Sequence, residues 1–265
     1  DQSPMKNHLT PAPAGGAGWF TDKGVNASAH AVMIYGDKRV YGARFEGHMG
    51  YRNDKTTGIA VGDEPETLYA VFNGKHYNSR CCFDYGNAET NNLDMGQGTM
   101  EAIYFGSAWR WGHGAGNGPW VMADLENGLW AGKDRVNKDN APIDADFVTA
   151  MLKGDSGDHF TLKGSKNGYD GLYRLYDGPR PNGNYRVMRK QGAIILGIGG
   201  DNSDWSVGTF YEGVMTEGYS NDETDDQVQS NIKAAKYTLI KPMLASSDDG
   251  ETLPEAGARL SLITV

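Results

Sequence analysis

The sequence predicts an all-β protein, a β-sandwich with one C-terminal helix, and three observations lead to this prediction. The chain has 265 residues, of which 37 are glycine. Aromatic residues make up 11% of it, and turn residues separate short apolar segments along most of its length. Short strands spaced by turn signals are typical of sandwiches. The length suits one large β domain or two small ones.

The expected strands follow in order. Residues 38–45 alternate apolar and polar side chains, as a half-buried strand does. Residues 67–72 end at Asn73-Gly74, which signals a hairpin turn. Residues 193–198 are apolar throughout, which predicts a buried central strand. The remaining segments with strand character are 100–105, 120–126, 147–152 with 160–164 across an Asp/Gly turn, and 208–215.

One helix is expected near the C-terminal end. Val228, Ile232 and Ala235 recur at i, i+4 and i+7. Acidic residues from Asp222 onward crowd its start, where the helix macrodipole favours negative charge. EF-hand spacing is absent, so we interpret this acidic run as a solvated helix N-terminus rather than a calcium loop. Residues 246–255 are polar like a linker, and residues 258–265 alternate like a strand.

Composition disfavours several classes of partner. The net charge of −9 argues against nucleic acid and against an anionic membrane surface. The chain has no apolar run of about 18 residues, so no membrane span is expected. No signal peptide is recognisable, and the start at Asp1 resembles a mature or truncated terminus. Asn26 heads the one glycosylation sequon, Asn-Ala-Ser, which has meaning only in a secreted protein.

The two cysteines of the chain, Cys81 and Cys82, are adjacent. A vicinal disulfide would present a rigid, apolar sulfur surface suited to one face of a sugar, at the cost of a distorted linking peptide. Two buried reduced thiols are the alternative. No further cysteine exists to complete a metal site, so neither a metal nor a cofactor is expected. Abundant glycine and aromatic residues describe ring-lined clefts, which suit carbohydrate.

Two segments carry candidate carboxyl groups. The Gly-rich stretch from Trp111 runs into Asp124 and Glu126, which would point to the same face of a strand. The apolar segment 193–198 is followed by glycines and then by Asp201, a candidate proton donor with a raised pKa. Glycosidases use such a pair, one as nucleophile and one as general acid/base. Ordinary turn and cap residues are the alternative, and spacing alone favours them.

Several motifs together resemble the catalytic domain of α-L-arabinofuranosidase B, glycoside hydrolase family 54. They are CCFDYGNAET, WGHGAGNGPW, ADLENGLW, GTFYEGVMT and QGAIILGIGGDNS, and the segments DQSPMKNHLT and GYRNDKTTG are similar as well. The resemblance runs in unbroken order over residues 1–237. It implies a secreted, retaining exo-enzyme whose catalytic domain is a concanavalin/laminin-G-like jelly-roll sandwich. Such enzymes remove terminal α-L-arabinofuranosyl groups from arabinan, arabinoxylan and similar glycans.

The resemblance also implies roles for individual residues. Glu126 matches the nucleophile, and Asp201 matches the acid/base. The expected substrate-binding residues are Cys81 and Cys82 as a vicinal disulfide packed on the furanose, Trp111 as the aromatic wall, Asp124 and Asn127 on sugar hydroxyls, and Gly200 where backbone meets the sugar. Rigid walls of this kind would select one ring pucker and aim the anomeric carbon at Glu126.

The resemblance further implies how the chain divides. Residues 1–245 would form the catalytic domain, without an N-terminal segment that family members have. Residues 246–265 would form a linker and the first strand of a carbohydrate-binding β-trefoil. The possibility that a separate polypeptide supplies the N-terminal segment stays open. Two rival functions also stay open, a non-catalytic arabinoglycan-binding sandwich and a furanosidase for another sugar such as galactofuranose, although two retained carboxyl residues argue against the first.

Overall fold

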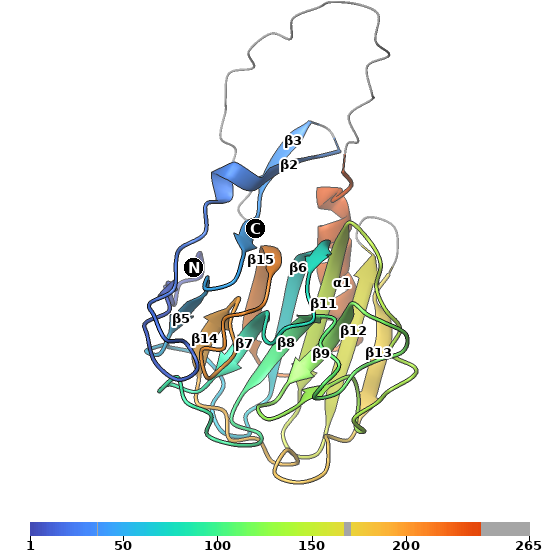
Figure 1. Cartoon of the computed structure of the whole chain (residues 1–265). Helices are drawn as coiled ribbons and strands as arrows, with labels where there is room; N and C mark the ends of the chain where they lie inside the picture. Colours follow the sequence, from blue (N-terminus) through green and yellow to red (C-terminus); the bar gives the residue numbers. More distant parts are fainter. Residues whose placement is uncertain (36, 167–170, 240–265) are drawn as a thin grey trace, which may run out of the picture.

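The protein folds as a β-sandwich of two antiparallel sheets that pack face to face (Figure 1). The structure is a computed structural model that describes residues 1–35, 37–166 and 171–239. The predicted all-β class with one C-terminal helix is confirmed. The linker and strand predicted for residues 246–265 lie outside the described residues.

Each sheet brings together strands that are distant in sequence. The seven-stranded sheet has the order β1 (Thr10–Pro11), β5 (Tyr51–Asn53), β14 (Ala193–Leu196), β7 (Asp84–Ala88), β8 (Glu101–Gly106), β9 (Trp120–Asp124) and β10 (Leu129–Trp130). The six-stranded sheet has the order β13 (Tyr173–Gly178), β12 (Phe160–Lys166), β11 (Phe147–Gly154), β6 (Glu66–Tyr77), β15 (Gly208–Glu217) and β4 (Ala43–Phe45). A separate hairpin pairs β2 (Ala31–Ile34) with β3 (Lys38–Tyr41), after the short 3₁₀ helix η1 (Ala27–His30).

The main core lies between the two sheets. Along β6, Leu68 and Phe72 point into it, and the intervening Val71 points to the other face, as the two-residue period of a strand requires. From the opposite sheet Phe105 stacks on Phe72 with ring centroids 5.6 Å apart. The predicted central strand is confirmed, because β14 lies between β5 and β7 and all of its residues are buried.

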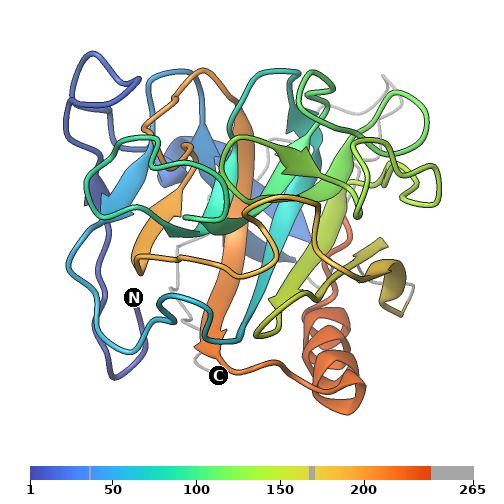
Figure 2. The ribbon, with the colours of Figure 1, turned by 90° about the horizontal axis from the view of Figure 1, so that it is seen from below.

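The helix α1 (Asp222–Ala235) packs on the outer face of the six-stranded sheet (Figure 2). Its residue Ile232 joins Val71 and Phe147 in a small apolar cluster there. The helix begins at Asn221, whose side chain accepts a hydrogen bond from the backbone N–H of Thr224. This is the N-cap arrangement that satisfies a free helix donor.

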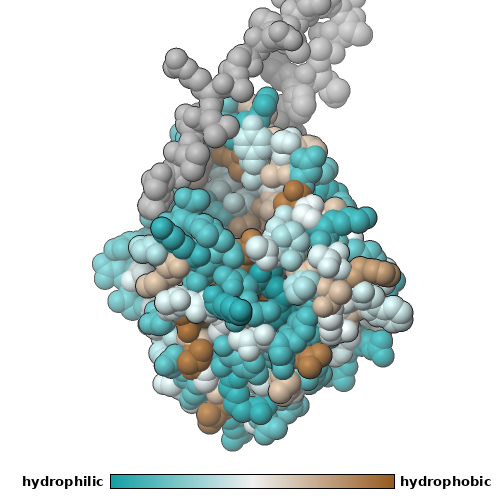
Figure 3. Space-filling model, turned by 90° about the vertical axis from the view of Figure 1, so that its left-hand side faces the viewer, coloured by the Kyte–Doolittle hydropathy of each residue, from teal (hydrophilic) through white to brown (hydrophobic). Residues whose placement is uncertain are grey.

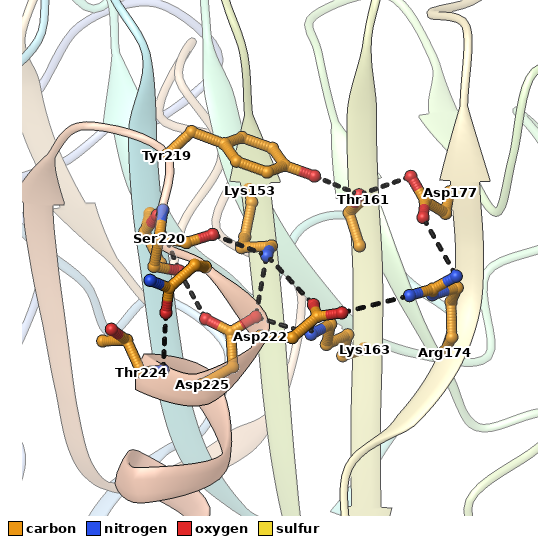
Figure 4. A network of polar contacts seen from close by, with 12 residues as sticks. Lys153, Thr161, Lys163, Arg174, Asp177, Tyr219, Ser220, Asp222, Thr224 and Asp225 are labelled. Atoms are coloured by element: carbon orange, nitrogen blue, oxygen red, sulfur yellow. Dashed lines mark hydrogen bonds and ion pairs between the residues drawn. The ribbon is translucent and has the colours of Figure 1, made fainter.

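The acidic start of α1 is only partly solvated, which corrects the interpretation from sequence. Asp225 is fully buried and accepts hydrogen bonds from the ammonium groups of Lys153 at 2.7 Å and Lys163 at 2.6 Å. Figure 4 shows these lysines reaching from the sheet to Asp225, with Arg174 contacting Asp222 at the edge of the network. Buried charges must be paired, so the network fixes where the helix sits.

We expect Asp225→Asn to destabilise the protein by about 3 kcal/mol, because it leaves two buried lysines without their shared carboxylate. Urea unfolding followed by circular dichroism measures the change. Asp226→Asn is the matched control, since Asp226 is exposed on the same helix and should change stability by less than about 0.5 kcal/mol. Equal stability of the two variants would contradict the role given to Asp225.

Two strand predictions were wrong in detail. Asn73-Gly74 makes no hairpin, because β6 continues to Tyr77 and the pairing with β15 merely shifts register there. A side chain at Gly74 would lie 2.2 Å from the carbonyl oxygen of residue 145, so close approach of another segment explains the glycine. The segment 38–45 breaks at Gly42 into β3 and β4, which belong to different sheets.

The surface is largely polar on the side shown in Figure 3, where hydrophobic residues form small separated groups. Asn26, the glycosylation candidate, is exposed immediately before η1. Among the described residues, no helix is long and apolar enough to cross a lipid bilayer.

Candidate active site

The candidate site lies on the outer face of the seven-stranded sheet. Tyr85 on β7 and Ile103 on β8 point into the core between the sheets. Asp84 precedes Tyr85 and Tyr104 follows Ile103, and the two lie opposite each other in the β7–β8 pairing. Because side chains alternate along a strand, Asp84 and Tyr104 point outward. On β9 Asp124 follows the core residue Ala123 and points outward as well. Polar groups can thus gather here without disturbing the sandwich core.

All eight residues predicted for the site line one cavity of about 190 Å³. They are Cys81, Cys82, Trp111, Asp124, Glu126, Asn127, Gly200 and Asp201. The cavity is small beside drug-sized pockets of roughly 300–1,000 Å³, which suits a single sugar residue. A second cavity of about 290 Å³ adjoins it and shares Trp111 and Asn127 as a wall.

Cys81 and Cys82 form a disulfide across a cis peptide bond. The Sγ atom of Cys82 lies 3.2 Å from a carboxyl oxygen of Asp124, and Cys81 Sγ lies 3.9 Å from the same atom. These three groups are close enough together to be compared with a metal site. However, the cysteine form that binds metal is the thiolate, and here the two sulfurs are bonded to each other.

Glu126 reaches the pocket from a turn rather than from a strand, which corrects the expected geometry. Strand β9 ends at Asp124, and Glu126 and Asn127 adopt positive φ values of 64° and 57°. Such values are uncommon outside glycine and need support from neighbours. Asp124 supplies it by accepting the backbone N–H of Glu126 at 3.1 Å, and the Tyr185 hydroxyl donates to the Glu126 carbonyl at 3.0 Å.

Asp201 lies in the tight turn that follows β14. Its side-chain oxygen accepts the backbone N–H of Ser203 at 2.9 Å, and the N–H of Asn202 donates to the carbonyl of Gly199 at 3.0 Å. Asn202 has a φ of 63°, a left-handed value that asparagine tolerates better than most residues. The turn therefore holds Asp201 in one place relative to the pocket.

Gly200, which precedes Asp201 in this turn, allows two carboxyl groups to approach the backbone closely. A Cβ atom at this position would lie 2.3 Å from Oε2 of Glu89 and 3.1 Å from Oε2 of Glu126. Any other residue here would displace these side chains, so the glycine is needed for space. Glu89 is fully buried beside the pocket, and the sequence alone did not indicate it.

Burial dominates the electrostatics of this cluster. It raises the pKa of Glu126 to about 11, and the nearby carboxyls of Asp124 and Glu89 add to the rise. Burial also raises the pKa of Asp124 to about 7. The hydrogen bond from the backbone N–H of Glu126 opposes this rise, because it stabilises the Asp124 carboxylate. Burial and the neighbouring Asp124 raise the pKa of Asp84 well above its ordinary value. Burial therefore favours the protonated forms of Glu126 and Asp84 over two further negative charges beside Asp124.

This electrostatic arrangement predicts that Glu126→Gln is more stable than the wild type at neutral pH. In the unfolded chain Glu126 ionises near its ordinary pKa of 4.5, whereas the folded pKa is about 11. Between these values the unfolded state binds fewer protons, so the free energy of unfolding falls as pH rises, by at most about 1.4 kcal/mol per pH unit. Glutamine does not ionise, so the free energy of unfolding of the variant does not fall in this way. The stability difference between the variant and the wild type should therefore shrink as pH falls toward 4.5.

Urea unfolding of both proteins over a pH series measures the effect. The control is Glu46→Gln, which removes a half-exposed carboxylate paired with Arg44 and should not reproduce the pattern. A variant that is less stable than the wild type at every pH would show that the buried Glu126 carboxyl does not carry this penalty.

Comparison with known proteins identifies the family to which this chain is similar. A family model described as "Alpha-L-arabinofuranosidase B, catalytic" matches residues 1–238. The α-L-arabinofuranosidase B of Aspergillus oryzae is 48% identical over 267 residues, which cover 99% of this chain and 51% of that protein. The enzyme of Aspergillus niger is 49% identical over 242 residues, covering 89% of this chain and 48% of that protein. The chain thus spans about half the length of these relatives.

Solved structures give the same result. One is a Glu-to-Gln mutant of a glycoside hydrolase family 54 α-L-arabinofuranosidase soaked with 4-nitrophenyl α-L-arabinofuranoside. It has a TM-score of 0.86 and 48% identity, covering 90% of this chain and 50% of that one. Another, an arabinofuranosidase complexed with arabinofuranosyl-α-1,2-xylobiose, has a TM-score of 0.86 and 49% identity over the same shares of the two chains. The chain belongs to the α-L-arabinofuranosidase B catalytic family, glycoside hydrolase family 54.

Proposed function

We propose that this chain carries the catalytic site of a retaining, exo-acting glycoside hydrolase. It releases terminal α-L-arabinofuranosyl residues from arabinan- and arabinoxylan-type glycans. The observation that carries the proposal is that Glu126, Asp201 and the Cys81–Cys82 disulfide line one small cavity. The family membership supports the choice of sugar.

In the first step Glu126 reacts in its ionised form, after losing to solvent the proton that burial favours. Its carboxylate attacks the anomeric carbon, and the bond to the leaving oxygen breaks. Asp201 donates its proton to that oxygen as it departs. The product is a covalent glycosyl-enzyme ester on Glu126 and an ionised Asp201. A retaining mechanism needs the two carboxyl groups about 5–5.5 Å apart.

In the second step Asp201 removes a proton from water, and the water oxygen attacks the anomeric carbon. The ester bond to Glu126 breaks, so both carboxyl groups return to their starting states. Two inversions at one carbon give overall retention of configuration.

The other lining residues hold the sugar. Asp124 and Asn127 would bind its hydroxyl groups, and the absence of a side chain at Gly200 lets the backbone approach the ring. Trp111, which is 42% exposed, and the disulfide would form apolar walls on either side. Holding a flexible furanose in one pucker lowers the entropic part of the barrier.

Hydrolysis of aryl α-L-arabinofuranoside, compared with aryl galactofuranoside, tests this proposal. We expect turnover of the first and a product of retained configuration, observed by NMR in the first seconds. Preference for the galactofuranoside would identify a furanosidase for another sugar. Binding of arabino-oligosaccharides without any turnover would identify a non-catalytic binding sandwich.

We also propose that the protein is extracellular, because a structural disulfide persists in an oxidising compartment. The native protein should contain no thiol that reacts with iodoacetamide, and reduction should expose two, measured by mass spectrometry. Two alkylated cysteines in the native protein would contradict both the disulfide and this location.

Cys81→Ala should weaken substrate binding more than it weakens the fold. We expect KM for an aryl arabinofuranoside to rise by about tenfold, since one wall of the pocket is lost. The melting temperature should change little, because a ring closed between neighbouring residues removes almost no unfolded-state entropy. Unchanged KM with a large fall in melting temperature would make the disulfide a structural element only.

A further inference from the structure

A buried arginine holds the turn that carries Asp201. Arg52 lies on β5 and is 2% exposed. Its Nη1 group donates a hydrogen bond to the carbonyl of Gly200 at 3.1 Å and another to the side-chain oxygen of Asn202. These two residues flank Asp201, so one guanidinium nitrogen fixes the chain on both sides of it.

The same guanidinium reaches the segment that carries Glu89. Its Nη2 group donates to the carbonyl of Glu89 at 2.5 Å. The carboxyls of Glu89 and Glu126 both approach Gly200. Arg52 therefore fastens the turn of Asp201 to the segment after β7, directly beside the pocket floor. It does not itself line the cavity.

The chemistry of this position calls for arginine. The planar guanidinium offers donors in fixed directions, whereas the lysine ammonium is a single point on a flexible stem. Here Nη1 and Nη2 serve three acceptors on two separate segments, and Nε donates to Asp54 at 2.8 Å. A lysine at the same place could not reach all of them together. Burying the charge of Arg52 costs free energy. Three of its four hydrogen bonds hold segments beside the pocket.

We propose that Arg52 is a positioning residue for general acid–base catalysis by Asp201. The inference rests on the function proposed above. An acid must lie within hydrogen-bond reach of the leaving oxygen, and a displacement of about 1 Å can cost about 100-fold in rate. Arg52 is the described side chain that bonds to both neighbours of the acid.

The test compares Arg52→Lys with the wild type on substrates that differ in their need for the proton. On arabino-oligosaccharides, kcat/KM should fall by about 100-fold, because the leaving oxygen requires protonation. On a dinitrophenyl arabinofuranoside the first step should fall by less than about tenfold, since this leaving group departs without a proton. Azide should then speed release of the covalent intermediate. Arg44→Lys on β4 is the control and should leave both rates unchanged.

A second variant guards against misfolding of the first. Asn202→Gly keeps the positive φ at no steric cost but removes one of the two acceptors of Nη1 and leaves the carbonyl of Gly200. It should therefore show the same substrate dependence with a smaller amplitude. Equal losses on both substrates in the two folded variants would reduce Arg52 to a structural role and overturn the inference. If Asp201→Asn itself shows no substrate dependence, the proposed role of Asp201 fails instead.

Discussion

Glu126→Gln is expected to abolish turnover of every arabinofuranoside, natural or activated. The amide oxygen of glutamine is a poor nucleophile, so no glycosyl-enzyme forms and no first step takes place. We expect kcat to fall by at least about 10⁴-fold. Steady-state assays on a dinitrophenyl and an oligosaccharide substrate measure it. Binding should survive, because glutamine has nearly the shape of glutamate.

The control for this variant is again Glu46→Gln, outside the pocket, which should keep wild-type activity. The raised pKa of Glu126 makes a reversed assignment worth testing, because a protonated carboxyl is suited to act as the acid. In that case Glu126→Gln would keep much of its activity on the dinitrophenyl substrate. Azide would then yield a glycosyl azide of retained configuration, and our assignment of nucleophile and acid would be wrong.

Asp201→Asn should separate substrates by their leaving groups. The variant lacks the proton donor but keeps the nucleophile, so we expect a loss of about 10²–10⁴-fold on natural glycans. The first step on the dinitrophenyl substrate should be largely kept. The second step lacks its base, so the covalent intermediate should accumulate and be visible by intact-protein mass spectrometry.

Added azide should raise the turnover of Asp201→Asn on the dinitrophenyl substrate, because this small anion attacks without needing a base. The product should be an arabinofuranosyl azide of retained configuration. Asp204→Asn is a useful comparison, since Asp204 lies in the same loop but bonds to His48 at 2.9 Å. Equal losses on both substrates and no response to azide would exclude Asp201 as the acid/base.

Local patterns in the sequence were enough for much of the fold. Apolar runs and turn residues indicated β8, β11, β12, β14 and β15, because a buried strand needs little more than a continuous apolar face. The helix α1 was predicted from its 3.6-residue period and its acidic start. Strand β7 was missed, because its sequence Asp-Tyr-Gly-Asn-Ala reads as turn residues. The structure buries all five, since this strand lies inside the sheet between β14 and β8.

The position of the carboxyl groups shows where local pattern fails. Strand alternation placed Asp124 and Glu126 on one face, whereas a left-handed turn brings Glu126 into the pocket. The roles of the eight site residues were assigned through family motifs, not through spacing, and all eight line one cavity. Spacing alone favoured the interpretation of these acids as turn and cap residues. The local sequence around a carboxylate at a strand end does not reveal which distant residues lie near it in the folded protein.

The sequence by itself therefore determined the sandwich class, most strands and, through its motifs, eight of the residues that line the pocket. Only the tertiary structure placed Glu89 beside Glu126 and joined Arg52 to Gly200, 148 residues away. It also showed that Asp225 is buried between two lysines. Hydrophobic periodicity involves residues that are close in sequence, so it can be recognised in a short segment. Pairings of buried polar groups depend on which distant segments meet, and no local pattern records that.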